Sequence, residues 1–219
     1  MASFVKHTIF DNDFLLHSGR VLYWEQEHIL ILSDLHFGKI THFRKNGIAA
    51  PTDIIKEDLH RLFETIQFFN PKKIVIVGDL FHSIANKEHE LFKRWRNDFL
   101  HIAFVLVKGN HDIISNGWYA DANIFVVQNF IQIKYFVFVH QLKDYTNSIK
   151  ENEYLICGHV HPSIVIKGMG RQSLKFPCFY FTKTYLLLPA FGKFTGTYVV
   201  EKNKTDTVFA IVNTEVIKV

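Results

Sequence analysis

The sequence predicts an α/β fold in which two β-sheets face each other and helices lie outside them. Short apolar runs typical of buried strands alternate with helical segments in the first half of the chain, and strand-like segments dominate the second half. The chain has 219 residues, of which 48% are hydrophobic, and this is enough for a large core. Because no repeat, low-complexity tract or linker interrupts it, we expect a single domain over residues 1–219.

The first elements are a predicted hairpin and a buried strand. Apolar and polar residues alternate in short pieces as far as Trp24, around the turn-forming sequence Ser18-Gly19-Arg20. The apolar residues 29–32 follow. They suit a strand buried on both faces, although a buried helical segment gives the same local pattern.

Two segments have helical periodicity. In residues 51–70 apolar side chains recur every three or four positions, and Pro51 and Thr52 form a suitable helix start. Residues 86–101 are expected to form a second helix with one apolar face. The apolar positions are Ile55, Leu59, Leu62, Ile66 and Phe69 in the first helix, and Leu91, Trp95 and Phe99 in the second.

Further strands are predicted by apolar runs between and after these helices. The strands between and just after the helices fall within KKIVIVGD and IAFVLVKGNHD. The later ones fall within YFVFVHQ, YLICGHVHP, SIVIKG, FYFTK and TYLLLPAFG, followed by alternating segments near the C-terminus.

Composition limits the class of protein. The net charge of +4 permits a polyanionic partner without demanding one. Two cysteines form no disulfide framework and suit a reducing compartment. The sequence contains no signal-peptide core and no apolar run of the roughly 18 residues that a membrane helix needs. We therefore expect a cytoplasmic protein that does not act in a membrane.

Five of the apolar runs end directly in side chains that can bind metal ions. Each has an ordinary explanation by itself, since Asp and Asn are common turn residues and a lone histidine is more often on the surface or hydrogen-bonded in the core. Together they favour a site, because ligands bind outside the carboxyl ends of strands in α/β sheets. The candidates are Asp34 and His36, Asp79, Asn110, His140, and His159 and His161.

This inventory is too large for one metal ion. Two carboxylates, four imidazoles and an amide suit two borderline divalent ions, such as manganese, iron or zinc, better than calcium or magnesium, which take mostly oxygen ligands.

At these residues the sequence resembles the calcineurin-like metallophosphoesterases, whose pattern is D-x-H, G-D, G-N-H-[DE], an isolated H and G-H-x-H. All five motifs are present, in the same order, between residues 28 and 161. The resemblance implies a four-layer α/β/β/α sandwich of two facing mixed β-sheets flanked by helices. It also implies that one ion is held by Asp34, His36, Asp79 and His161, and the other by Asp79, Asn110, His140 and His159.

The same resemblance implies the chemistry. Two ions about 3.5–4 Å apart, bridged by Asp79, would activate a water for in-line attack on phosphorus. His111 would lie beside the scissile phosphate, where it would stabilise the transition state or protonate the leaving oxygen. His82 is the next candidate for a catalytic role, because GDLFH resembles the nuclease branch of the superfamily.

Two further stretches bear on the substrate. Just past the first motif, Lys39, Arg44 and Lys45 occur with Phe37 and Phe43, a mixture of cations and aromatic rings that suits phosphate and base contacts. An amphipathic helix with a solvated basic face explains them equally well. The sequence LPAFGKFTG, residues 188–196, is expected to be a structural loop that closes the second sheet.

Both stretches, with GDLFHS, GHVHP and PCF, resemble the bacterial DNA-ligase-associated metallophosphoesterases, the PdeM family. This resemblance implies a manganese-dependent phosphodiesterase or endonuclease acting on DNA, expected to be single-stranded, in DNA repair. It also implies a functional association with a DNA ligase, a helicase and an exonuclease. The chain departs from the family at Gln141-Leu142, where a Glu-Pro or similar pair is expected.

The same motifs also bear on other functions of this fold. A metallophosphoesterase acting on a small-molecule or lipid phosphodiester or pyrophosphate is the main alternative, although the sequence has no apolar membrane-facing lid. A monoesterase or protein phosphatase should carry an Asp and Arg pair after Gly78-Asp79, and this chain does not. A non-catalytic scaffold of the same fold should have lost ligands, whereas all seven are present.

Overall fold

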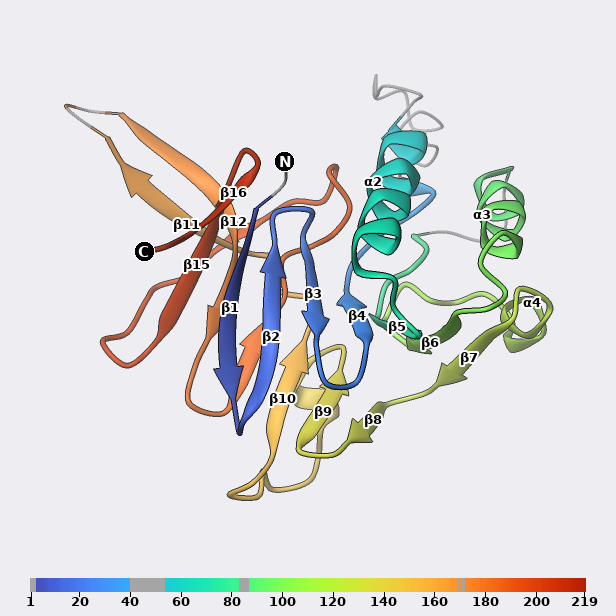
Figure 1. Ribbon diagram of the computed structural model, residues 1–219, viewed down its shortest axis with the longest axis horizontal. Coiled ribbons are helices and arrows are strands. Elements are labelled where there is room, and N and C mark those ends of the chain that lie inside the picture. The colour runs from blue at the N-terminus through green and yellow to red at the C-terminus, as the bar shows by residue number, and fades with distance from the viewer. Residues whose placement is uncertain (1–2, 40–53, 83–86, 169, 171) are drawn as a thin grey trace.

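The computed structural model describes residues 3–39, 54–82, 87–168, 170 and 172–219, and two mixed β-sheets face each other in it (Figure 1). The first sheet contains seven strands in sequential order. They are β1 (Phe4–Ile9), β2 (Asn12–His17), β3 (Val21–Trp24), β4 (Ile29–Leu32), β5 (Lys73–Val77), β6 (Ala103–Val107) and β7 (Ile124–Val127).

The first sheet changes from antiparallel to parallel at β4. Strands β1 to β4 are connected as antiparallel hairpins, including the predicted turn at residues 18–20. Strands β4, β5, β6 and β7 are parallel, with Leu32 opposite Ile76 and Ile76 opposite Leu106. In β4 the side chains of all four residues are buried, as expected for an apolar run in a parallel sheet. The carboxyl ends of β4, β5 and β6 therefore lie at one edge.

The second sheet contains nine strands, and its central pairs β9 with β10 and β10 with β13 are parallel. This arrangement places the ends of β9 and β10 beside each other. The strands are β8 (Phe130–Ile133), β9 (Phe136–Val139), β10 (Tyr154–Cys157), β11 (Pro162–Lys167), β12 (Ser173–Phe181), β13 (Tyr185–Leu187), β14 (Tyr198–Val199), β15 (Thr207–Val212) and β16 (Glu215–Lys218).

In the part of the chain that the structure describes, three α-helices pack on the outer face of the first sheet: α2 (Ile54–Phe69), α3 (Lys87–Asn97) and α4 (Asn116–Asp121). Both long helices were predicted, although residues 51–53 and 86 lie outside the described residues. Helix α3 ends four residues before the predicted end. Its buried face contains Phe92, whereas Leu91 is exposed, so the predicted apolar face was wrong at that position.

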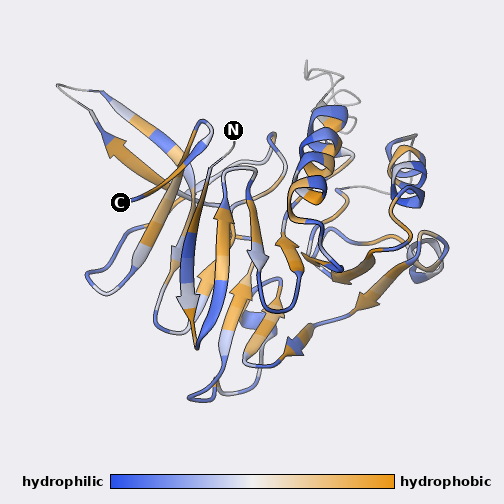
Figure 2. Ribbon diagram, in the orientation of Figure 1, coloured by the Kyte–Doolittle hydropathy of each residue, from blue (hydrophilic) through white to orange (hydrophobic). Residues whose placement is uncertain are grey.

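Two cores hold the layers together. Between the sheets, aliphatic side chains of β4, β5 and β6 meet aromatic side chains of the second sheet, among them Phe136, Phe138 and Phe179. Each fully buried ring contributes about 2 kcal/mol relative to an exposed one. The other core lies between the first sheet and its helices, whose apolar residues alternate with polar ones (Figure 2).

The predicted sandwich of two facing mixed sheets with helices outside is confirmed. The described helical cover is uneven, because the outer face of the second sheet packs against a 3₁₀-helix, η1 (Leu142–Asp144), and connecting segments. Among the described helices, none has both the length and the apolar character needed to span a bilayer.

Candidate metal centre

The candidate ligands follow the ends of β4, β5, β6, β9 and β10. The loops after β4 and β5 are joined by backbone hydrogen bonds, because Asp34 N donates to Gly78 O (3.0 Å) and His36 N donates to Asp79 O (2.9 Å). The two sheets are joined in the same region, where His159 N donates to Asp34 Oδ2 (2.9 Å). Segments far apart in the sequence are thereby held at one place.

Three candidate ligands form a first group: Asp34, His36 and His161. One ligand atom of each lies within 4.8 Å of the others, and His161 Nε2 is 3.1 Å from Asp34 Oδ1. The other ring nitrogen of His161, Nδ1, lies 3.0 Å from the carbonyl oxygen of Gly196. That carbonyl can accept the Nδ1 proton and leave Nε2 for a metal ion.

Asp79, His140 and His159 form a second group with the same 4.8 Å limit. His140 Nδ1 lies 3.0 Å from Val77 O, which again directs Nε2 toward the group. Asn110 joins the group, since its Oδ1 is 3.3 Å from His140 Nε2. Gln141 Nε2 donates to the same oxygen (3.1 Å), so the residue that departs from the family pattern contacts a candidate ligand.

Asp79 lies between the two groups. Its Oδ2 is 3.6 Å from His36 Nε2 in the first group and 3.4 Å from His140 Nε2 in the second. Its Oδ1 accepts a hydrogen bond from the backbone N–H of His111 (2.9 Å). The same carboxylate oxygen therefore lies close to one histidine nitrogen of each group, which is the position that a ligand bridging two metal ions needs.

The protonation states of these groups suit cation binding. Burial is the strongest single influence on Asp79 and disfavours its charge, but the hydrogen bond and charge of His140, the backbone N–H of His111 and the charge of His36 together outweigh it and lower the pKa of Asp79 to about 2. Burial likewise disfavours charge on His140, yet its hydrogen bond to Asp79 and the charge of Asp34 raise the pKa of His140 to about 9. The proton on His140 neutralises part of the charge of Asp79 and Asp34, and a metal ion bound at His140 could neutralise the same charge in its place.

His36 supplies the clearest sign that the residues fit a metal ion. Its side chain is buried, and neither ring nitrogen has a hydrogen-bond partner among the described residues. Burial lowers the pKa of His36 to about 3, despite the attraction of Asp79 and Asp34, so the ring is neutral at pH 7. Buried polar atoms are seldom left without partners, and a neutral imidazole is a good ligand for divalent cations.

The two predicted catalytic histidines lie next to this group. The ring centroids of His82 and His111 are 4.5 Å apart in a stacked arrangement. Both rings lie edge-on to His36, at 5.4 Å for His82 and 5.3 Å for His111. They are thus positioned to reach a ligand at the first group without belonging to it.

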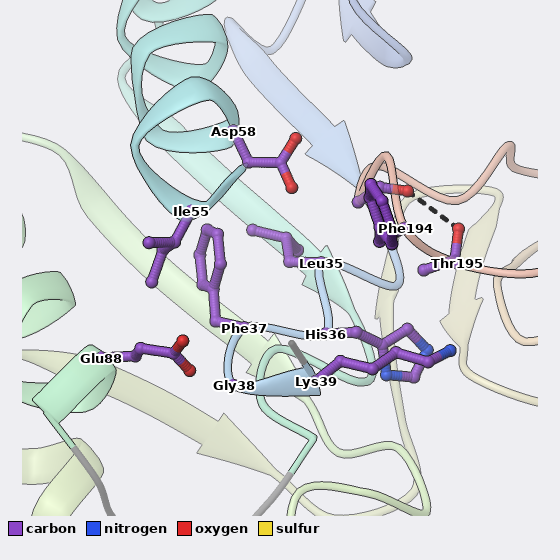
Figure 3. Close-up of a pocket in the computed structure, with 11 residues that line it drawn as sticks. Leu35, His36, Phe37, Gly38, Lys39, Ile55, Asp58, Glu88, Phe194 and Thr195 are labelled. Carbon is purple, nitrogen blue, oxygen red and sulfur yellow. Dashed lines mark hydrogen bonds between the residues drawn. The ribbon is translucent and has the colours of Figure 1, made fainter. Parts of the chain in front are cut away.

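Of the predicted substrate-binding residues, Lys39 is described and Arg44 and Lys45 lie outside the described residues. Partial burial lowers the pKa of Lys39, while the charges of Asp79 and Asp34 oppose that effect. Lys39 lines a pocket together with His36 (Figure 3). Phe37 is buried in the core, so the suggestion that it contacts bases was wrong, and Phe43 is outside the described residues.

Asp112 is a residue to which the sequence assigned no role. Its buried carboxylate accepts hydrogen bonds from the backbone N–H groups of Asp79 (2.8 Å) and Gly109 (2.9 Å), and from Leu80 and Phe81. It therefore fixes the loop after β5 against the loop after β6. Its place as the last residue of G-N-H-D was the signal that could have identified it.

The loop at residues 188–196 does not only close the second sheet. It reaches the end of β4, where Phe191 N donates to Ser33 O (2.8 Å) and Gly192 N donates to Asp34 O (3.1 Å). The loop therefore has a structural role, as expected, but it contacts the loop of the first sheet that carries Asp34.

Comparison with known proteins agrees with this geometry. The model of the family described as calcineurin-like phosphoesterase matches residues 27–174. No curated protein sequence matches the chain.

Among solved structures, a nuclease MPE from Pseudomonas putida is 24% identical over 99% of this chain and 100% of that chain, with a TM-score of 0.83. At this identity the likeness establishes the fold. A phosphoesterase from E. coli is 15% identical over 87% of this chain and 97% of that chain, and its TM-score of 0.48 is too low to support an argument. The family match covers most of the chain and all five motifs, so the chain belongs to the calcineurin-like phosphoesterases, which are hydrolases acting on phosphoester bonds.

Proposed function

We propose that the chain is a phosphodiesterase with a two-metal centre, and that its substrate is DNA. The single observation that carries the proposal is the position of Asp79 Oδ2, within 3.6 Å of ligand atoms from both groups. The proposed ligands of one ion are Asp34, His36, Asp79 and His161. Those of the other are Asp79, Asn110, His140 and His159.

The residues divide the work between them. When bound, the ions would supply Lewis acidity to the phosphoryl oxygens and a water whose pKa is lowered to about 7. His111 would hold a proton beside the leaving oxygen, and the stacked ring of His82 would fix its orientation or exchange that proton. Lys39 would bind a phosphate oxygen, since it lines the same pocket as His36.

The identity of the ions and of the substrate is also part of the proposal. Mixed nitrogen and oxygen ligands suit Mn²⁺, with Fe²⁺ or Zn²⁺ as alternatives. The name of the Pseudomonas putida nuclease and the cationic Lys39 beside the site support a nucleic acid, and the sequence resemblance supports DNA, expected to be single-stranded. A role in DNA repair, with a DNA ligase, a helicase and an exonuclease as functional partners, rests on the sequence resemblance alone, and the proposed cytoplasmic location rests on the sequence composition.

The test uses metal-stripped protein with and without Mn²⁺, and the His111→Asn variant as control. The substrates are circular single-stranded DNA, a small aryl phosphodiester and the matching monoester. We expect Mn²⁺-dependent cleavage of the circle and of the diester, both lost in the control. Turnover of the diester with an intact circle would contradict DNA as substrate and favour a small-molecule or lipid diester, and preference for the monoester would contradict a phosphodiesterase.

A further inference from the structure

Two exposed aromatic side chains lie next to the candidate metal centre. Phe194 is 45% exposed and Tyr198 is 66% exposed. They lie two residues on either side of Gly196, whose carbonyl oxygen is 3.0 Å from His161 Nδ1. Tyr198 N also donates to His161 O (2.9 Å). Both rings are therefore carried by backbone that is hydrogen-bonded to a candidate ligand.

The segment that carries Phe194 is hydrogen-bonded to the loop after β4 and to α2, and it contains one further hydrogen bond within itself. Gly192 N donates to Asp34 O, Lys193 N donates to Asp58 Oδ2 on α2 (3.4 Å), and Thr195 Oγ1 donates to Gly192 O (2.8 Å). Figure 3 shows this last bond beside the ring of Phe194. A large apolar ring that stays exposed on a well-tethered loop is already positioned for a ligand, so little conformational entropy is lost on binding.

Phe194 lines the same pocket as the cationic Lys39 and the candidate ligand His36. The pocket is lined by Phe194, His36 and Lys39, and the acidic Glu88 lies at its opposite end (Figure 3). Its volume of about 20 Å³ has room for little more than a water molecule. Neither a base nor a phosphate group fits inside it, so a substrate that reached Lys39 and the metal centre would lie across the rim, beside the exposed ring of Phe194.

We infer that Phe194, with Tyr198 as a second platform, stacks against unpaired bases next to the phosphodiester that is cleaved. The inference rests on the proposed function and narrows it to nucleic acid whose bases are free on both faces near the site. Every base has a π-face, so such contacts tolerate any sequence, whereas paired bases in a duplex are already stacked. A lipid or aliphatic diester has no π-face to stack, so its contact with the rings would be non-directional apolar packing.

The test compares two single-stranded oligonucleotides of equal length, one with bases and one made of abasic units, in the presence of Mn²⁺. Stacking on one aromatic side chain is typically worth about tenfold or more in binding. We therefore expect the wild type to have a kcat/KM for the strand with bases that exceeds its kcat/KM for the abasic strand by about tenfold or more. Phe194→Leu should remove most of this preference by slowing only the strand with bases, and Phe194→Trp should retain it. Tyr198→Leu should reduce the preference less.

Phe125→Leu is the matched control, because Phe125 is an exposed phenylalanine on β7, remote from the loop at 188–196. It should leave both rates unchanged. An unchanged preference in Phe194→Leu would overturn the inference and leave the proposed function intact, as would equal slowing on both strands, which indicates a merely structural ring. If the wild type cleaved neither strand, the proposed function would fail together with the inference.

Discussion

Five of the seven candidate ligands adopt a backbone conformation that residues with a side chain usually avoid. Asp34, His36, Asp79, His159 and His161 all have φ between 50° and 65°. Such left-handed conformations cost about 1–3 kcal/mol each and persist where the surrounding structure holds them. Here the loop-to-loop hydrogen bonds and the carboxylate of Asp112 hold them, so the arrangement of the site is built into the fold before any ligand binds.

Gly109 leaves the space that this arrangement needs. A Cβ atom at residue 109 would lie 2.2 Å from Asp79 Oδ1 and 2.6 Å from Asp79 N. We expect Gly109→Ala to displace Asp79 and reduce Mn²⁺ binding at least tenfold, measured by titration calorimetry. Gly117→Ala is the control, because a Cβ there would meet nothing within 4 Å, and it should bind Mn²⁺ as the wild type does. Equal affinities in all three proteins would contradict the proposed place of Asp79.

His111 offers a test of chemistry apart from metal binding. His111→Asn keeps the backbone N–H that Asp79 accepts but removes the imidazole. Because acid–base catalysis contributes roughly 10²- to 10⁴-fold, kcat should fall by about that factor while the metal content stays the same. Metal content would be measured by mass spectrometry and kcat with an aryl diester. Wild-type turnover in the variant would remove His111 from the mechanism.

At the scale of elements, α2 holds the loop at 188–196 in place. Arg61 forms a salt bridge with Asp58 (2.8 Å), donates to Phe191 O, and lies over the Phe191 ring at 4.2 Å. Burial raises the pKa of Asp58 and lowers that of Arg61, so desolvation opposes this pair. The pair therefore serves mainly to position the loop at 188–196. Removing Arg61 would leave the buried charge of Asp58 without a partner, which lowers the free energy of unfolding.

We therefore expect Arg61→Met to lower the free energy of unfolding by about 3 kcal/mol, as measured by urea denaturation. Lys193→Met is the control: the ion pair from Lys193 to Glu57 (2.9 Å) is half-exposed and contributes about 0–1 kcal/mol. A loss of under 1 kcal/mol in Arg61→Met would show that the pair of Arg61 and Asp58 contributes little to the stability of the protein.

The β2–β3 hairpin contains a group that makes stability depend on pH. His17 is buried, its Nδ1 accepts the backbone N–H of Gly19 (3.0 Å), and burial lowers its pKa below the ordinary 6.5. Below about pH 6.5 the unfolded chain gains a proton that the folded chain resists, so stability falls as the pH falls.

His17→Asn keeps an acceptor for Gly19 but does not titrate. Between pH 7.5 and 5.5, the free energy of unfolding of this variant should fall less steeply than that of the wild type, by up to about 1.4 kcal/mol per pH unit. Urea denaturation at several pH values measures this. Parallel pH profiles for the two proteins would exclude His17 as the cause.

Over the whole molecule, the sequence predicted the strands that end at the site better than the short elements elsewhere in the fold. Apolar runs ending in Asp34, Asp79 and His140 identified the strands that meet at the site, because buried parallel strands need continuous apolar residues. Strands β7 and β8 and helix α4 were not predicted. They are short, and their apolar residues follow neither period for long.

Contacts between distant segments could not be read from the chain. The hydrogen bonds from Phe191 to Ser33 and from His159 to Asp34 join residues more than 120 positions apart, and local periodicity carries no information about them. The single domain, the metal, the DNA substrate, the partner proteins and the location in the cell stay predictions.

Electron paramagnetic resonance of the Mn²⁺-saturated protein would show whether Asp79 joins two metal ions in one centre. Two Mn²⁺ ions about 3.5–4 Å apart would be magnetically coupled, so we predict a coupled spectrum at two ions per chain that is lost in Asp79→Asn. The uncoupled six-line spectrum of an isolated ion at saturation, unchanged by Asp79→Asn, would rule out a centre in which Asp79 bridges two ions.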